Sequence, residues 1–292
     1  MSLKDSIHQK KKSLSFEVFP ALTPEAEARL MTALKELSAL KPDFISCTYG
    51  AGGGNRDKTF GVVEHIQKTY SIPAMAHLTC VSHSRVEIEA ILKEFGSRGI
   101  ENVLALRGDP PKTKPGEPAP KAGEFRYSSE LVAFIRSKMG GKVSIGVAGF
   151  PEKHLLAASF EADAGYLKEK VLAGADFVIT QLFFDNGKYF EYVERLRKLG
   201  VTNRILPGIL PVTDYQALKR FCERCGANVT PEVHSIFGPL DGDSQKTVEA
   251  GIDFAVKQCR ELLKGGAPGI HFYTLNKFHP TDSIVEALRP LL

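Results

Sequence analysis

Eight short apolar runs alternate with longer segments along this chain, and no other feature limits its fold as much. In the longer segments apolar residues recur every three or four positions, the spacing of one helix face. The runs are Leu14–Pro20, Phe44–Gly50, Ala74–Cys80, Val103–Gly108, Ser144–Phe150, Phe177–Phe184, Ile205–Leu210 and Ile270–Leu275. Strands that alternate with helices form parallel sheets covered by those helices. The sequence therefore predicts an α/β protein with eight β/α repeats.

A (β/α)8 TIM barrel is the arrangement that we predict for these repeats. Eight repeats in 292 residues fit one such barrel. A doubly wound sheet is the alternative, but it usually carries a Gly-x-Gly-x-x-Gly turn after its first strand. The first run here ends in Phe19-Pro20-Ala21, which cannot form that turn. We expect a single domain over residues 1–292, with residues 1–13 as a flexible or helical extension.

The segments between the runs predict most of the helices. Several end at glycines typical of helix C-termini, namely Gly99, Gly174 and Gly200. Proline-rich Pro110–Glu124 predicts an irregular loop, and Asn228–Lys264 predicts an extra helix between the seventh and eighth strands. The clearest helical segments are Ala26–Leu40, Val86–Phe95, Leu155–Ala173 and Tyr189–Leu199.

Charge and composition exclude several classes of protein. The net charge is only +4 and no long basic run occurs, which argues against a nucleic-acid partner. No run of about 18 apolar residues predicts a membrane span. The five cysteines are an odd number, and the N-terminus has no apolar signal segment. We therefore expect a cytoplasmic protein with reduced thiols.

Polar residues at the predicted strand ends are the candidate site, because a barrel collects function at the carboxyl ends of its strands. Glu17 alternates with Phe16 and Val18, so it points into the barrel if those two pack against helices. A buried carboxyl group keeps its proton to higher pH than an exposed one, which suits a general acid. The alternative is a structural ion pair between Glu17 and a buried arginine or lysine.

Three other strand ends carry candidates, each with a structural alternative. Arg107-Gly108-Asp109 offers a cation, a glycine and a carboxylate, although Asp109 also fits a residue that caps a turn. His77 is either a ligand contact or a core histidine with satisfied hydrogen bonds. Gln181 either binds a ligand or makes a structural hydrogen bond, since a buried amide needs partners.

Two glycine and cysteine motifs are weak signals. Ala51-Gly52-Gly53-Gly54 could cradle a phosphate, but it lacks the Lys-Ser/Thr of a Walker loop. Cys222-x-x-Cys225 is a lone pair without a second pair or a nearby histidine at zinc-finger spacing. Two thiols on one helix face are the simpler interpretation, and we predict no metal.

Seven motifs at the predicted strand ends, from Leu14 to about Pro280, are weak singly but specific in this order. They are Ser15-Phe16-Glu17-Val18-Phe19-Pro20, Thr48-Tyr49-Gly50-Ala51, Ala76-His77-Leu78-Thr79-Cys80, Leu106-Arg107-Gly108-Asp109, Thr180-Gln181-Leu182-Phe183-Phe184-Asp185, Pro207-Gly208-Ile209-Leu210-Pro211 and Phe272-Tyr273-Thr274-Leu275-Asn276. Together they resemble the bacterial methylenetetrahydrofolate reductase family. The resemblance implies a catalytic, FAD-binding barrel that reduces 5,10-methylenetetrahydrofolate to 5-methyltetrahydrofolate. The hydride passes from NADH or NADPH through FAD in a ping-pong reaction of one-carbon metabolism and methionine biosynthesis. A homo-oligomer such as a tetramer is also implied.

The resemblance assigns roles residue by residue. Glu17 matches the general acid that opens the folate aminal to an iminium, and Asp109 matches a catalytic carboxylate between flavin and folate. Substrate contacts fall on Glu17, Thr48, Asp109, Gln181, Phe221 and Lys277. Flavin contacts fall on Thr48, Tyr49, Ala51, His77, Arg107, Gly108, Asp109, Tyr127, Ser128, Phe150, His154, Asp163 and Lys170.

Several positions depart from the family pattern. Phe150 stands where a tyrosine is familiar, and Tyr166 and Glu169 replace an asparagine and an arginine beside the adenosine half of the flavin. Lys277 replaces an arginine near the folate and keeps its charge but not its bidentate geometry. Ala217 replaces a glutamine, with Gln216 next to it. These changes affect binding detail and leave Glu17, Asp109 and Gln181 in place.

Two other functions stay open at this point. One is a flavin- and folate-binding subunit of a larger redox complex that receives its electrons from a partner. The other is a metal-dependent barrel lyase, which needs a cluster of carboxylates and histidines. The sequence assigns no residue that distinguishes NADH from NADPH.

Overall fold

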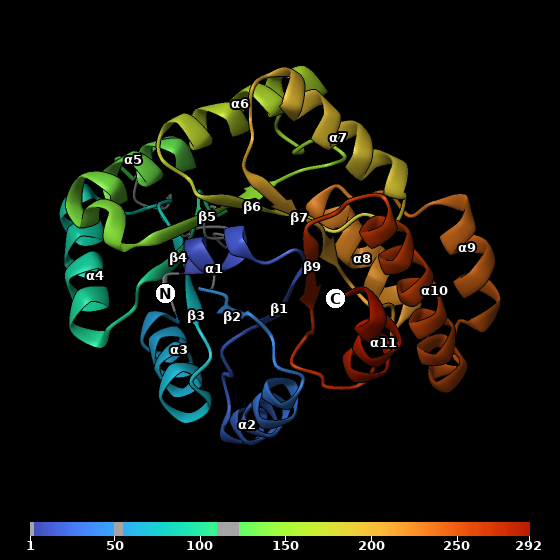
Figure 1. The fold of residues 1–292 in the computed structure, drawn as a ribbon. Coiled ribbons are helices and arrows are strands. Elements are labelled where there is room, and N and C mark those ends of the chain that lie inside the picture. The colour runs from blue at the N-terminus through green and yellow to red at the C-terminus, as the bar shows by residue number, and fades with distance from the viewer. Residues whose placement is uncertain (1–2, 50–54, 110–122) are drawn as a thin grey trace, which may run out of the picture.

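A computed structural model describes residues 3–49, 55–109 and 123–292 of the chain. Its strands form one parallel sheet in the order β7-β6-β5-β4-β3-β2-β1-β9-β8, and helices surround this sheet (Figure 1). The bounds are β1 Ser13–Val18, β2 Phe44–Cys47, β3 Ala74–Thr79, β4 Asn102–Leu106, β5 Ser144–Gly149, β6 Phe177–Thr180, β7 Arg204–Leu206, β8 Gly208–Ile209 and β9 Gly269–Tyr273. The predicted (β/α)8 barrel is confirmed.

The predicted seventh strand is divided at Pro207, which accounts for nine strands rather than eight. Before the proline, β7 pairs with β6, and after it β8 pairs with β9. A proline has no backbone N–H to donate, but the Pro207 carbonyl accepts from His271 N at 3.0 Å. The chain therefore changes pairing partner within one run, and this change closes the barrel.

The helices lie close to their predicted positions, and the predicted extra helix is present. The exception is the segment that starts at Leu155, because α6 begins only at Phe160, where the Ser159 hydroxyl accepts from Ala162 N at 3.1 Å. The bounds are α1 Leu3–Gln9, α2 Pro24–Ala39, α3 Arg56–Tyr70, α4 Arg85–Arg98, α5 Ser128–Met139, α6 Phe160–Leu172, α7 Asn186–Lys198, α8 Tyr215–Cys225, α9 Pro231–Phe237, α10 Ser244–Lys264 and α11 Thr281–Leu288. In the part of the chain with described structure, no helix is long and apolar enough to cross a membrane.

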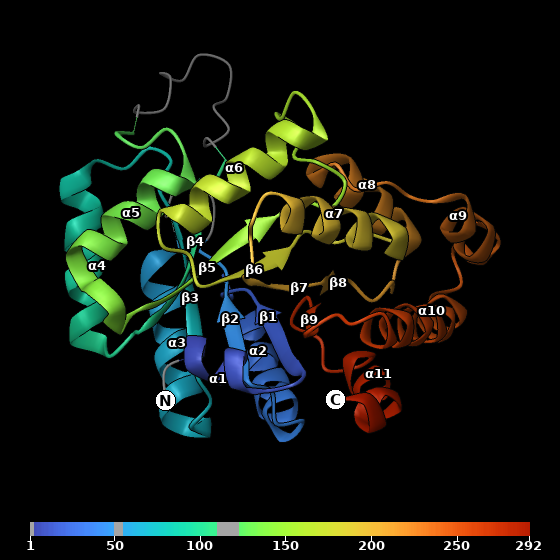
Figure 2. The ribbon, with the colours of Figure 1, turned by 45° about the horizontal axis from the view of Figure 1, so that its top comes forward.

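Helices α8, α9 and α10 gather on one side of the barrel (Figure 2). Val233 and Phe237 of α9 are buried in a cluster with Leu182, Phe184 and Phe254. The extra helix therefore adds a second apolar layer beyond the carboxyl ends of β6 and β8. That layer fixes α8, which borders the site described below.

Helix α1 covers the amino-terminal end of the barrel and lies over the ring of strands in Figure 1. Leu3 and Ile7 are fully buried in a cluster with Phe44, Phe177 and Leu206, which lie on the strands. The Arg204 guanidinium donates to the carbonyls of Ile7 and Lys10 at the end of this helix. Because α1 covers this end, we expect ligands to enter from the carboxyl ends of the strands.

Candidate active site

Glu17 lies inside the barrel, as the alternation along β1 predicts. Phe16 and Val18 are fully buried in the apolar layer under the helices, and the Glu17 side chain keeps 18% of its surface exposed. Its Oε2 atom is 3.4 Å from His77 Nε2 and 3.8 Å from His271 Nε2. Among the described residues its ion-pair partners are thus two histidines rather than an arginine or lysine.

The two imidazoles are poised near Glu17 without being hydrogen-bonded to it. Within the described structure, neither Nε2 atom has a hydrogen-bond partner, so the 3.4 Å separation is an approach and not a formed bond. Burial lowers the pKa of His77, His271 lowers it further, and Glu17 raises it in part. Burial has the larger effect, so the His77 imidazole is neutral at neutral pH. A proton used in acid catalysis at this site is therefore not stored on His77.

Strand β9 fixes both the backbone and the surroundings of Glu17. Thr274 donates to the Glu17 carbonyl through its hydroxyl at 2.7 Å and its N–H at 3.3 Å. His271 Nδ1 contacts the Ser15 hydroxyl at 2.8 Å, two residues before Glu17 and on the same face of β1. Glu17, His271 and Ser15 therefore form a polar row into the barrel interior. Ser15 is not among the predicted site residues, although its place two residues before Glu17 on the same strand face is a signal for it.

The Tyr273 side chain reaches from the end of β9 to the end of β6, where the barrel closes. Its hydroxyl donates to the Thr180 carbonyl at 2.7 Å, and burial, aided by the charge of Glu17, raises its pKa well above the usual value. Gly208 lies beneath this contact and donates its N–H to the Thr180 hydroxyl at 3.0 Å. A Cβ at position 208 would lie 2.2 Å from the Thr180 carbonyl oxygen, so only glycine fits.

Gln181 lies at the carboxyl end of β6 in a hollow that it shares with Cys225 and Phe150. Cys225 is half-buried at the end of α8, and burial raises its thiol pKa while the Gln181 side chain opposes that shift. The other thiol of the motif, Cys222, is buried. Among the described residues, no group of three or more His, Cys, Asp or Glu side chains could hold a metal ion.

The predicted flavin contacts on β5 and α6 form one connected group. Lys170 donates to the Ala148 carbonyl at 2.9 Å, and its ammonium lies 5.5 Å from the centre of the Phe150 ring. The Lys170 side chain as a whole is half-buried, but its ammonium is enclosed, and this burial lowers its pKa to about 8. Asp163 accepts from His154 N at 3.1 Å, and burial raises its pKa.

Arg107, Gly108 and Asp109 follow directly after β4, at the carboxyl ends of the strands, which we call the barrel mouth. Burial lowers the pKa of His154, Arg107 lowers it further, and Asp109 opposes both effects, so both charges lie near this histidine. Gly108 has a φ of +80°, and a Cβ there would lie 2.7 Å from Thr79 Cβ. The Cys80 thiol is 3.8 Å from the Arg107 carbonyl and 3.9 Å from that of Tyr127, which joins the start of α5 to this group.

The remaining predicted contacts differ in how far they are buried. Tyr49 is almost fully buried against Phe60 of α3, so its side chain lies in the layer behind the barrel. Thr48 is half-buried, with its N–H donating to the Val18 carbonyl at 3.0 Å. Ser128 is buried at the start of α5, whereas Phe221 on α8 is 38% exposed. Ala51 and its glycine loop, and residues 110–122 of the proline-rich segment, lie outside the described residues.

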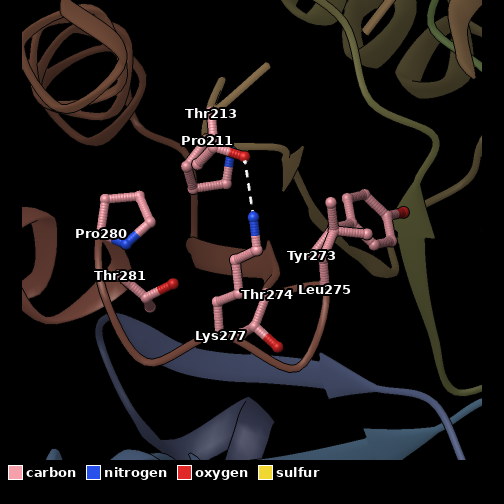
Figure 3. A pocket seen from close by; sticks show the side chains of 8 residues that line it. All are labelled: Pro211, Thr213, Tyr273, Thr274, Leu275, Lys277, Pro280 and Thr281. Carbon is pink, nitrogen blue, oxygen red and sulfur yellow. Dashed lines mark hydrogen bonds between the residues drawn. The ribbon is translucent and has the colours of Figure 1, made fainter. Parts of the chain in front are cut away.

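Lys277 borders a shallow hollow beside Tyr273 (Figure 3). Its ammonium reaches across the hollow to the Thr213 hydroxyl at 3.3 Å. The walls of the hollow also include Pro211 and Leu275, so one cation stands among apolar side chains. The role of Lys277 as a substrate contact stays a prediction.

Sequence comparison identifies proteins that are similar to this chain. The chain is 36% identical over 276 residues to the 5,10-methylenetetrahydrofolate reductase of Salmonella typhimurium, covering 94% of this chain and 90% of that protein. It is 34% identical to methylenetetrahydrofolate reductase (NADH) 1 of Arabidopsis thaliana, covering 94% of this chain but only 48% of that protein. The chain therefore spans about half the length of the plant relative.

The fold also matches a solved structure. A Clostridium thermocellum protein described as binding two copies of 5-methyl-5,6,7,8-tetrahydrofolic acid superposes with a TM-score of 0.65 over 99% of both chains, at 14% identity. At that identity the match shows the fold alone. The family model described as methylenetetrahydrofolate reductase matches residues 2–289. With 36% identity to the Salmonella enzyme over nearly the whole chain, this match shows that the chain belongs to the methylenetetrahydrofolate reductase family.

Proposed function

We propose that this chain is a flavoenzyme that reduces 5,10-methylenetetrahydrofolate to 5-methyltetrahydrofolate, with FAD as its cofactor and NADH or NADPH as its reductant. The observation that carries the proposal is the Glu17 carboxyl group, inside the barrel of a chain of this family and 3.4 Å from a buried histidine. We also propose one catalytic domain, a homo-oligomer and a role in one-carbon metabolism, on family resemblance.

The residues at the barrel mouth fit FAD. Arg107 and Lys170 would hold its phosphates. Gly108 lets the chain turn between Arg107 and Asp109, because its φ of +80° and the nearby Thr79 side chain leave no room for a Cβ. An anionic phosphate would also stabilise the enclosed Lys170 ammonium, whose pKa burial now lowers to about 8. The chemistry that bound FAD would supply is hydride transfer from the pyridine nucleotide to the folate.

Glu17 supplies the proton in this mechanism. Methylenetetrahydrofolate holds its one-carbon bridge between two nitrogens, and protonation of the arylamine nitrogen opens it to an electrophilic iminium. Glu17 would protonate that nitrogen, while the Asp109 carboxylate favours the cationic iminium. His271, 3.8 Å from the Glu17 carboxyl group and joined to Ser15, would return a proton afterwards. Gln181 and Lys277 would orient the folate.

A flavin spectrum tests the proposal. The purified chain, supplied with FAD if needed, should show a flavin absorption band that NADH or NADPH bleaches and methylenetetrahydrofolate restores. Stopped-flow traces with each nucleotide would identify the reductant. Failure to take up FAD would contradict the proposal, whereas FAD uptake without bleaching by either nucleotide would favour the subunit of a larger redox complex.

A further inference from the structure

The loop after β5 is joined to the segment after α8 by one carboxylate. Both oxygens of Glu152 accept hydrogen bonds from Asn228, one from its backbone N–H at 2.9 Å and one from its side-chain amide at 2.7 Å. Asn228 follows shortly after the end of α8 at Cys225. We call this pair the clasp, because it connects two segments that are 76 residues apart in the chain. The proposed reaction gives neither residue a part.

An apolar contact beside the clasp joins the same two segments. The Leu155 side chain packs over Gly226, where an added Cβ would lie 2.7 Å from Leu155 Cδ2. Gly226 ends α8 in a left-handed conformation, with a φ of +80°, and leads the chain to Asn228. The clasp and this contact therefore act together on the carboxyl end of α8.

The two segments line the same hollow as Gln181. The loop after β5 contributes residues 150–153, and the end of α8 with the residues after it contributes 225–227. Phe221 lies on α8 about one turn before Cys225. Gln181 and Phe221 are both predicted to contact the folate, so a shift of α8 would change the site at which they act.

We propose that Glu152 is a positioning residue for folate binding. Through Asn228 it holds the end of α8 against the loop after β5, and this keeps Phe221 and the hollow beside Gln181 in their binding geometry. The inference rests on the proposed function, since it assigns Glu152 an effect on the affinity for that substrate.

The flavin side of the same loop is held by other bonds. Phe150 N donates to the Tyr192 hydroxyl at 3.2 Å, and His154 N donates to the Asp163 carboxylate at 3.1 Å. Loss of the clasp should therefore weaken folate binding and leave FAD binding unchanged. The alternative is that the clasp only stabilises the fold, in which case its loss would lower the melting temperature and leave the KM for folate unchanged.

The Cys225 thiol reports the position of α8 without any cofactor or substrate. Cys225 is half-buried, whereas the other four cysteines of the chain are buried, so a maleimide should label it first. Glu152→Ala should increase the labelling rate roughly fivefold, the low end for two lost hydrogen bonds. Burial raises the pKa of the Cys225 thiol and the Glu152 charge adds to this effect, so removal of the charge alone would also speed labelling. Glu152→Gln separates the two causes, because it removes the charge while its carbonyl still accepts from Asn228 N, and its rate should stay close to that of the unmodified chain.

Steady-state kinetics test the effect on substrate binding. Glu152→Ala should raise the KM for methylenetetrahydrofolate roughly 2- to 30-fold and keep kcat and FAD affinity within about twofold, because it removes no reacting group. Asn228→Asp should also raise this KM, since it sets two carboxylates against each other. Its combination with Glu152→Gln should restore the KM, because the glutamine amide then donates to the aspartate. Glu223→Ala, at an exposed position of α8, is the matched control.

The outcomes separate this inference from the function on which it rests. An unchanged KM in Glu152→Ala overturns the inference even if labelling is faster, because the clasp would then support α8 without serving substrate binding. An equal loss of FAD affinity also overturns it, since the whole mouth would have changed, and both results leave the flavoenzyme proposal standing. If the unmodified chain reduces no folate, the proposed function fails first, and the labelling rates still decide whether the clasp holds α8. Circular dichroism melting of each variant would verify that it is folded.

Discussion

Two imidazoles face the Glu17 carboxyl group, His77 at 3.4 Å and His271 at 3.8 Å. A lysine or arginine in either place would hold Glu17 as a carboxylate and prevent it from carrying a proton. Burial lowers the pKa of His77, so this neighbour brings no fixed positive charge to Glu17 at neutral pH. The side chains around Glu17 therefore suit proton transfer better than a structural ion pair.

Glu17→Gln should separate the two half-reactions. An amide keeps the shape of the carboxyl group but cannot donate its proton, so folate reduction should fall by about 10²- to 10⁴-fold. Flavin reduction by the pyridine nucleotide needs no such acid and should keep its rate. Stopped-flow measurement of each half-reaction checks this, with Glu36→Gln at an exposed position of α2 as a control. An equal loss in both half-reactions would remove Glu17 from the role of acid.

Lys170 predicts how cofactor affinity depends on pH. Its pKa in the flavin-free chain is lowered to about 8, so it loses its charge as the pH rises through that value. FAD affinity should then decrease above pH 8, by up to about tenfold per unit, because a neutral amine binds phosphate poorly. Titrations between pH 7 and about 9.5 check this. In Lys170→Met this decrease should disappear, and an unchanged profile would argue against a phosphate contact.

The same shift has an opposite consequence for folding. Because the folded pKa of Lys170, about 8, is below its ordinary value of 10.5, the unfolded chain binds more protons between these two values. The contribution of this group to stability therefore increases as the pH rises through that window. Cofactor binding weakens over the same range in which this contribution to folding improves.

At the scale of elements, the ends of β1 and β9 are joined by side chains as well as by backbone pairing. The Asn276 amide donates to the Phe19 carbonyl at 2.8 Å, and its oxygen accepts from Phe19 N at 2.9 Å. Asn276 has a φ of +58°, a left-handed conformation that asparagine tolerates better than most residues. This contact and the Thr274 bonds to Glu17 hold the end of β1 in place.

Asn276→Ala should destabilise the fold by about 1–3 kcal/mol, through two lost hydrogen bonds and a strained backbone. Asn276→Gly loses the bonds but keeps the backbone conformation at little strain, so it should cost less. Urea unfolding of the three proteins would separate the two contributions. Equal stability of all three would show that the junction does not hold β1. A displaced Glu17 should also reduce folate turnover more than flavin reduction.

The order and type of elements could be predicted, because alternation of apolar runs and helical spacing reports burial directly. The break at Pro207 could not, since it depends on which strand pairs with each side of the proline. The late start of α6 had a local signal in Ser159, a residue that favours helix N-caps. Leu155 and Leu156 obscured it, because their apolar character resembles a helical face although both remain exposed.

The site was predictable to the extent that it lies on strand ends. Glu17, His77, Arg107 and Gln181 follow from alternation and from the barrel rule. Cys225 did not, because its position beside Gln181 depends on how α8 packs against the barrel. The Glu152–Asn228 clasp likewise depends on the approach of two distant segments, which sequence spacing does not report.

At the scale of the whole molecule, stability and chemistry are assigned to opposite ends of the barrel. Ile7→Ala should lower the free energy of unfolding by about 2–5 kcal/mol, because it leaves a cavity under the strands. The folded fraction should keep its flavin affinity and turnover, since α1 lies at the end away from Glu17. Ile7→Val, a smaller truncation, should cost about 0.5–1.5 kcal/mol. Altered turnover at full folding would show that the two ends are coupled.

Pro207 and Gly208 set a boundary for any redesign of this barrel. Pro207 has no backbone N–H to donate where the chain changes its pairing strand. Gly208 has no room for a side chain beneath the Tyr273–Thr180 contact. A combinatorial library aimed at new substrates can vary Gln181, Phe221 and Lys277, which are at least partly accessible. It gains nothing at position 208, where a side chain would collide with the Thr180 carbonyl and disturb barrel closure before any substrate preference could be measured.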